Sequence, residues 1–139
     1  GGGVVASGVL LMLCKGDTAT RSLLVRQGGV ALATALTKSP DVTVQSEACG
    51  VLATLSNHKH LHSHMLSEGV LNVMLKAAVS NEEAVRVPAA KALSHLGSDP
   101  AIQQQILRHP QLQKAFSNIK VHKGTDDPYL VYLSLLSPP

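Results

Sequence analysis

The segment Glu47–Leu55, EACGVLATL, carries the pattern that decides the fold. It recurs upstream at 5–13 as VASGVLLML and downstream at 88–96 as PAAKALSHL, at offsets of 42 and 41 residues. A fourth, degraded copy at 128–136, PYLVYLSLL, keeps only the two leucines in register. A period of this length indicates a helical solenoid, because each repeat is one supersecondary unit that stacks on the next.

A second motif recurs with the same period and predicts where other helices end. It reads LVRQG at 24–28, MLSEG at 65–69 and ILRHP at 106–110. Gly28 and Gly69 suit the position just past a helix end, where a left-handed backbone is favoured, and Pro110 stops its helix by other means. Apolar runs follow, and then turns with helix-start signals. The runs cover 30–36, 70–79 and 112–119, and the turns cover 39–41, 80–83 and 125–128. Each unit is therefore expected to hold a short, a medium and a long helix.

Two details of the long helices bear on packing. Gly8 and Gly50 occupy the same place in successive copies and are expected to allow close helix contact, at a cost of roughly 1 kcal/mol each against alanine. Pro88 lies inside the third long helix, where it lacks a backbone N–H and should kink or restart the helix. A functional kink and neutral drift are both open.

The composition favours an all-helical core. Of 139 residues, 45% are hydrophobic but only 2% are aromatic, which argues against a sheet sandwich and for closely packed Leu, Val and Ala. No apolar stretch approaches the roughly 18 residues of a membrane span. The net charge of +3 is spread along the chain, which is weak support for nucleic-acid binding.

The ends and the cysteines suggest a piece of a longer intracellular protein, cytoplasmic or nuclear. The chain opens on GGG without Met, and no secretory signal or Asn-x-Ser/Thr sequon is visible. Its two cysteines, Cys14 and Cys49, lie in apolar helical patterns, so we expect buried, reduced, structural thiols.

These residues resemble the armadillo repeat family. The family's third-helix pattern, EAAWALSNL, is met by EACGVLATL at 47–55 and by AAKALSHL at 89–96. The resemblance implies an all-α fold, a right-handed α-solenoid of about three to three and a half repeats of 41–42 residues within one fragment, 1–139. HEAT repeats are the nearest alternative. The expected units are a leading third helix at 1–16, repeats at 17–57 and 58–98, and a degenerate last repeat at 99–139.

The family also implies a site, because its third helices line a concave face on which extended peptides bind. In nuclear import receptors a ladder of Trp and Asn holds a basic signal; here Gly8, Gly50, Lys91 and Val131 replace the Trp, and Met12, Thr54, His95 and Leu135 replace the Asn. The ladder is absent, and Lys91 would repel a nuclear localisation signal. A groove for an acidic partner needs rows of Lys and Arg, and these helices supply only Lys91.

What remains is a shallow face that suits a partner peptide or helix. We expect the partner-binding residues to be Met12, Gly50, Thr54, Lys91, His95, Val131 and Leu135. The leading function is a protein-interaction scaffold. The alternative is a regulatory or targeting module of a larger enzyme, such as a kinase, ubiquitin ligase or hydrolase, with this face docked intramolecularly.

The sharpest local oddity is a run of four histidines at alternate positions: His58, His60, His62 and His64. If one helix carried them, two i, i+4 pairs would form, and such a pair can chelate zinc. Two ligands make a weak site, so the main expectation is ordinary polar residues between repeats, with no bound metal. Metal binding and pH sensing are the alternatives.

Catalysis is not expected within this chain. The sequence lacks a Gly-x-Ser-x-Gly elbow, a Gly-rich phosphate loop and a His-Glu-x-x-His motif. Asp126 and Asp127 lie in a helix-start loop, where capping accounts for them. We therefore expect no cofactor and no small-molecule substrate.

Overall fold

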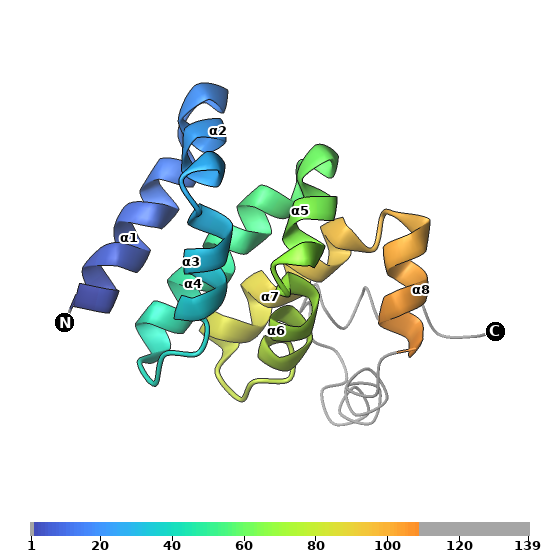
Figure 1. Cartoon of the computed structure of the whole chain (residues 1–139). Helices are drawn as coiled ribbons and strands as arrows, with labels where there is room; N and C mark the ends of the chain where they lie inside the picture. Colours follow the sequence, from blue (N-terminus) through green and yellow to red (C-terminus); the bar gives the residue numbers. More distant parts are fainter. Residues whose placement is uncertain (1, 109–139) are drawn as a thin grey trace.

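The computed structural model describes residues 2–108, and within that range all regular structure is helical (Figure 1). The all-α prediction is confirmed for this part of the chain. Pro110, the run at 112–119, the turn at 125–128 and the fourth copy at 128–136 lie outside the described residues. The elements are α1 (Gly2–Cys14), α2 (Thr18–Arg26), α3 (Gly29–Leu36), α4 (Val42–Ser56), a 3-10 turn η1 (Lys59–Leu61), α5 (His62–Ser67), α6 (Val70–Ala77), α7 (Glu83–Leu96) and α8 (Pro100–Arg108).

The long helices α1, α4 and α7 lie side by side and form one layer (Figure 1). The shorter helices form a second layer, in which α3 packs on α4 and α6 packs on α7. The core between them is aliphatic, since tight helix packing needs no large ring. Its largest fully buried side chains are Leu52, Leu55, Met65, Met74, Leu75, Leu93, Leu96, Ile102 and Ile106.

The two short helices of each repeat are joined by the same backbone conformation. Gly28 and Gly69 have φ of +83° and +80° and stand immediately before α3 and α6. Only glycine adopts this left-handed conformation at little cost. The left-handed glycines expected from the recurring motif are therefore confirmed.

Side-chain hydrogen bonds also recur with the period of 41 residues. Ser39 and Ser80 each accept, at Oγ, a bond of 3.1 Å from the amide two residues later. Their carbonyl oxygens accept bonds from the side chains of Gln45 and Arg86, respectively. The turn before each long helix is thus built the same way twice, which makes the described chain a structural repeat and not only a sequence repeat.

Pro88 does not restart α7, which runs unbroken from Glu83 to Leu96. A proline in a helix removes the N–H that would bond the carbonyl four residues earlier. That carbonyl belongs to Ala84, and the Ser46 hydroxyl of α4 donates to it at 2.8 Å. A neighbouring helix therefore supplies the bond that Pro88 cannot make.

This arrangement predicts a coupled pair of mutations. Ser46→Ala should cost about 1 kcal/mol, because it leaves the Ala84 carbonyl without its protein donor. In a Pro88→Ala background the same change should cost close to nothing, since residue 88 would then donate through its own N–H. A double-mutant cycle measured by urea unfolding checks this. Strictly additive effects would contradict the proposed compensation.

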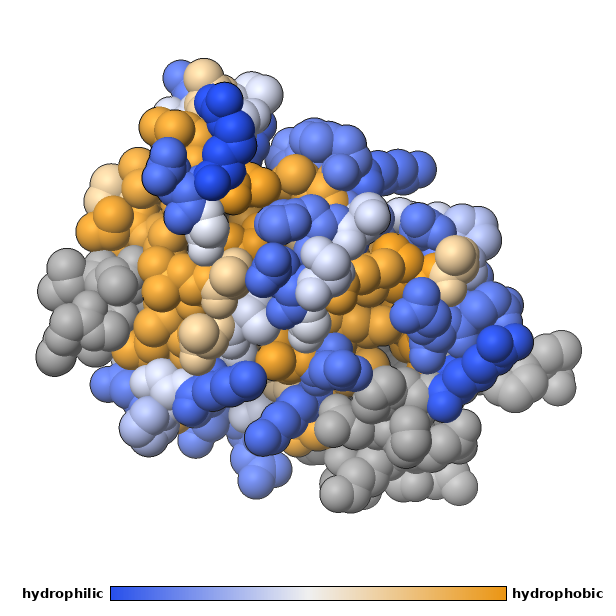
Figure 2. Space-filling view, in the orientation of Figure 1, coloured by the Kyte–Doolittle hydropathy of each residue, from blue (hydrophilic) through white to orange (hydrophobic). Residues whose placement is uncertain are grey.

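Apolar side chains lie exposed at the α1 end of the stack. Val9 and Met12 of α1 are 45% and 71% exposed, and Leu23 of α2 and Leu32 of α3 are 51% and 46% exposed. Figure 2 shows apolar residues gathered over this end of the molecule. The α1 end of the stack thus presents an exposed apolar surface. At the corresponding place, the other long helices contact a neighbouring long helix.

Both cysteines are fully buried, as expected. Burial raises the pKa of the Cys49 thiol to about 12. Burial also raises the pKa of Cys14, although Thr54 and the charges of Lys15 and Arg21 oppose it. Both residues therefore stay as neutral thiols in the folded protein at neutral pH. Among the helices of residues 2–108, none combines the length and apolar character needed to cross a membrane.

Candidate protein-binding groove

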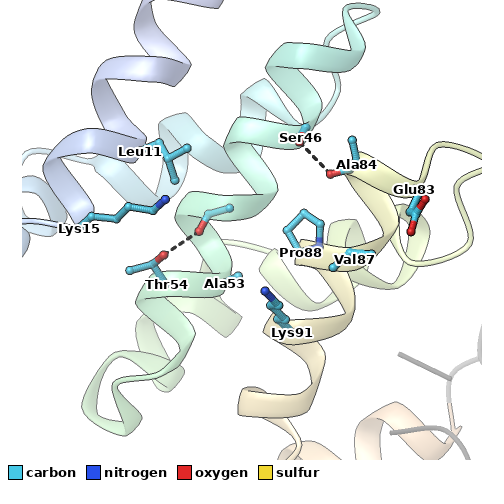
Figure 3. Close-up of a pocket in the computed structure, with 11 residues that line it drawn as sticks. Leu11, Lys15, Ser46, Ala53, Thr54, Glu83, Ala84, Val87, Pro88 and Lys91 are labelled. Carbon is cyan, nitrogen blue, oxygen red and sulfur yellow. Dashed lines mark hydrogen bonds between the residues drawn. The ribbon is translucent and has the colours of Figure 1, made fainter. Parts of the chain in front are cut away.

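A groove follows the layer of long helices, and its first part is mainly apolar (Figure 3). This part, the apolar end, is a hollow of about 580 Å³ between α1, α4 and α7. Leu11 of α1 and Val87 of α7 lie on its two sides. Gly50 of α4 is also part of its lining. Its full lining is Leu11, Lys15, Ser46, Gly50, Ala53, Thr54, Glu83, Ala84, Val87, Pro88 and Lys91.

The second part of the groove, the basic end, is a hollow of about 530 Å³ near the C-terminal ends of the same helices. It shares Lys15, Ala53, Thr54 and Lys91 with the apolar end, so the two hollows are continuous. Its full lining is Cys14, Lys15, Arg21, Ala53, Thr54, Asn57, His58, Lys91 and His95. Three of these side chains are cationic, and none of these described residues carries a carboxylate.

The structure brings together four of the residues predicted from the third-helix pattern. Gly50 and Thr54 lie on α4, and Lys91 and His95 lie on α7, all in the lining of the groove. Thr54 occupies the centre, with Lys15, just after α1, and Lys91 of α7 on either side of it (Figure 3). Val131 and Leu135 lie outside the described residues.

Met12 does not line either hollow, and Leu11 of the same helix takes that place. A Cβ placed on Gly50 would lie 3.2 Å from Leu11 Cδ1, and one on Gly8 would lie 3.1 Å from Glu47 Oε2. The two glycines therefore set a close approach of α1 to α4, as their repeated position suggested. Leu11 lines the groove and Met12 does not, because one residue along a helix rotates a side chain by about 100°.

Arg21 is fixed at the edge of the basic end by the turn that it spans. Its guanidinium donates to the Gly16 carbonyl at 2.6 Å and to Thr18 Oγ1 at 3.3 Å. Desolvation lowers the pKa of His58, and the positive charge of Arg21 and the neighbouring His60 lower it further. His58 is therefore neutral at pH 7, and the fixed charge here comes from Lys15, Arg21 and Lys91.

His95 is held in place by the C-terminal end of α4. Its Nδ1 lies 3.2 Å from the Ala53 carbonyl and 3.0 Å from Ser56 Oγ, and the Ser56 hydroxyl donates to the same carbonyl at 2.7 Å. Because a carbonyl can only accept, Nδ1 carries the ring proton in this arrangement. Nε2 is the ring nitrogen that remains for a ligand.

The Ser56 and His95 pair has the spacing of a nucleophile and its base, but Ser56 is 1% exposed. Its hydroxyl hydrogen is directed to the Ala53 carbonyl and its oxygen is packed inside the protein. A substrate carbonyl could not reach this oxygen. The geometry therefore fits a structural bond between α4 and α7 better than catalysis.

Sequence reasoning did not place Lys15 and Arg21 in the groove. Lys15 follows the end of α1, outside the nine aligned positions of the repeat, and Arg21 lies on α2, which is not a third helix. The statement that only Lys91 supplies positive charge is thus corrected for the groove as a whole. Extending the alignment by two residues beyond each third-helix copy would have included Lys15.

The four histidines do not share one helix. His58 precedes η1 with an extended backbone, His60 lies within η1, and His62 opens α5. His62 is only 3% exposed, and its Nε2 lies 2.6 Å from the Ser56 carbonyl. The ring centroids of His58 and His60 are 6.0 Å apart, whereas His64 is exposed on α5. The expectation that one helix carries all four is therefore wrong, because His58 precedes the 3-10 turn, and the inward-facing His62 is not available to pair with it.

Among the residues described, no cluster of three or more His, Cys, Asp or Glu side chains is arranged to hold a metal ion.

Comparison with known proteins gives the fold alone. No family model and no curated protein matches this chain. Among solved structures, it is similar to three engineered proteins from the Northeast Structural Genomics Consortium, at TM-scores of 0.78, 0.77 and 0.77 and identities of 22%, 22% and 18%. Each match covers 96% of this chain, but only 53%, 32% and 54% of the engineered chains. The chain therefore spans about half of two of these proteins and a third of the other, and it has a helical, repeat-like fold.

Proposed function

We propose that this chain is an armadillo-type α-solenoid that binds a protein partner in the groove along α1, α4 and α7. The armadillo assignment is supported by three helices in each repeat, α2 to α4 and then α5 to α7, where a HEAT unit would have two. The right-handed superhelix belongs to the same proposal, as does an intracellular location, cytoplasmic or nuclear.

The observation that carries the binding proposal is the continuity of the groove across three consecutive long helices. An extended segment can lie along such a surface, with apolar side chains against Leu11 and Val87 and polar groups near Thr54 and His95. The inaccessible Ser56 supports a binding role without catalysis.

A peptide-display selection tests this proposal. Peptides selected on the wild-type protein should lose at least about tenfold in affinity for Thr54→Arg, because the long side chain fills the centre of the groove, and tenfold corresponds to about 1.4 kcal/mol. Thr43→Arg is the matched control, since Thr43 is exposed on the same helix and lines neither hollow. Circular dichroism confirms that both variants fold.

Selected peptides that bind Thr54→Arg as well as wild type would place the interaction elsewhere and remove the groove proposal. A selection that enriches no peptide would also count against it.

A second candidate function is favoured by the exposed apolar residues at the α1 end. Val9, Met12 and Leu32 form a surface that suits another packed element of a larger protein. In that case the chain is a regulatory or targeting module of an enzyme, docked on its own catalytic domain. A full-length protein whose groove variant Thr54→Arg changes catalytic activity without a partner present would support this candidate.

A further inference from the structure

We infer that the basic end of the groove recognises acidic side chains, so that the partner is an Asp- or Glu-rich peptide segment. This inference rests on the proposed function and names the chemistry of the partner. Lys15, Arg21 and Lys91 line one hollow of about 530 Å³, Lys15 from the turn after α1, Arg21 from α2 and Lys91 from α7.

The positive charge of this hollow is not offset by a carboxylate in its own lining. Its described lining holds no Asp or Glu, and Glu83 lines only the apolar end. Asp17 caps α2, where its carboxylate accepts from the Thr20 amide at 2.8 Å, and its charge offsets part of that of Arg21. Lys15 and Lys91 are exposed, and no carboxylate lines the basic end, so they create a positive field that the groove focuses on an incoming anion.

The positions of the cations favour a peptide that runs along the groove. Lys15 and Lys91 line both hollows, on opposite sides of α4, so one extended segment can place an acidic residue between them. The apolar end then accepts the segment's aliphatic residues beside Leu11 and Val87. His95 Nε2 offers an acceptor for a backbone N–H at the middle of this path.

A nucleic acid is the less suitable anion for this surface. Single-stranded nucleic acids are held by aromatic platforms on which bases stack, as well as by positive charge. Residues 2–108 contain no Phe, Tyr or Trp. The groove therefore has charge for carboxylates, but the rings in its described lining are His58 and His95, with no Phe, Tyr or Trp platform for a base.

The test uses a dye-labelled peptide of repeated Glu-Ser-Leu units, with fluorescence anisotropy as the readout. A Gln-Ser-Leu peptide is the neutral control and a single-stranded RNA oligonucleotide is the competing anion. The Glu peptide should bind about tenfold more tightly than the Gln peptide, and more weakly as salt is raised.

The variant is Lys15→Met/Lys91→Met, in which methionine keeps much of each apolar stem. It should weaken binding of the Glu peptide about tenfold, since two ion pairs with the peptide are lost together. Lys38→Met/Lys76→Met removes the same charge from a separate hollow beside α6, and should change affinity less than about twofold.

Three outcomes would overturn the inference: equal binding of the Glu and Gln peptides, full binding by Lys15→Met/Lys91→Met, or RNA that binds more tightly than the Glu peptide and depends on the same lysines. If the Glu peptide does not bind at all, the acidic partner is also overturned. In that event the peptide-display test decides the proposed function separately. The groove proposal stands if the selected peptides lose affinity for Thr54→Arg, and it is overturned as well if they do not.

Discussion

Replacing Gly29 with alanine is expected to destabilise the protein by about 3 kcal/mol, which is at the upper end for overpacking one methyl group. A Cβ at Gly29 would lie 2.7 Å from the Leu24 carbonyl oxygen and 2.7 Å from Leu24 Cγ. One of these atoms is backbone, so a side-chain rotation cannot remove the clash. Gly29 is also buried at the start of α3, and water cannot relieve the crowding.

The adjacent Gly28 is the control for this experiment, because it is needed for a different reason. A Cβ at Gly28 meets nothing within 4 Å, but its φ of +83° is left-handed. Gly28→Ala should therefore cost only the conformational strain of about 1 to 2 kcal/mol. Urea unfolding of both variants gives the two free energies. A Gly29→Ala cost equal to or below that of Gly28→Ala would show that α3 can shift freely.

The next repeat suggests a partial rescue of the same defect. Forty-one residues after Gly29 the chain has Val70, fully buried, and 41 residues after Leu24 it has Met65. An unbranched methionine can move away from a neighbour that a γ-branched leucine would touch. Leu24→Met should therefore recover part of the stability lost in Gly29→Val. The absence of any recovery would mean that the backbone contact alone sets the cost.

His62→Ala is expected to cost about 2 to 3 kcal/mol, because it combines a cavity with a buried acceptor that loses its donor. The Ser56 carbonyl belongs to the last turn of α4, where the helix itself offers no partner. His62 Nε2 lies 2.6 Å from that oxygen in a site that is closed to solvent. The histidine therefore ties the end of α4 to the start of α5.

The matched control for His62 is His60, which is exposed and lies two residues earlier in the same run. His60→Ala should change the free energy of unfolding by less than about 0.5 kcal/mol. Thermal or urea unfolding of the two variants separates them. Equal losses of stability in the two variants would mean that the 2.6 Å contact of His62 with the Ser56 carbonyl adds nothing to the free energy of unfolding.

The period of the sequence predicted the helices and their ends because it reflects constraints that are local. Gly28 and Gly69 mark left-handed positions, and Asp41 caps α4 by accepting from two amides of its first turn. Each of these depends on a few neighbouring residues and recurs with the repeat. The alternation of short and long helices follows from the same signals.

The groove was predicted less completely because it depends on how helices rotate against one another. Pattern matching placed Thr54 and Lys91 in the groove, but chose Met12 where Leu11 lies. Arg21 joins the basic end only because the turn after α1 brings α2 back to the long helices. Neither effect can be read from one period of the sequence, since each is set by contacts between units.

The inward turn of His62 was missed for a related reason. Four histidines at alternate positions resemble an exposed polar run, and nothing in their spacing singles out one of them. The 3-10 turn at Lys59–Leu61 changes the rotation, so that His62 points to the Ser56 carbonyl while His60 and His64 stay in solvent. The 41-residue period of the sequence therefore cannot show which of these histidines is buried, because the short turn alone decides it.

The bond from Ser46 to the Ala84 carbonyl has a consequence for how the repeats unfold. Together with the contact of His95 with Ser56, it joins α4 to α7 near both ends of their shared interface. In a linear array, stability is divided between the units and their nearest-neighbour interfaces, and stronger interfaces make unfolding more cooperative. The two described repeats should therefore exchange their amide hydrogens as one block, because loss of either repeat breaks these bonds at its interface with the other.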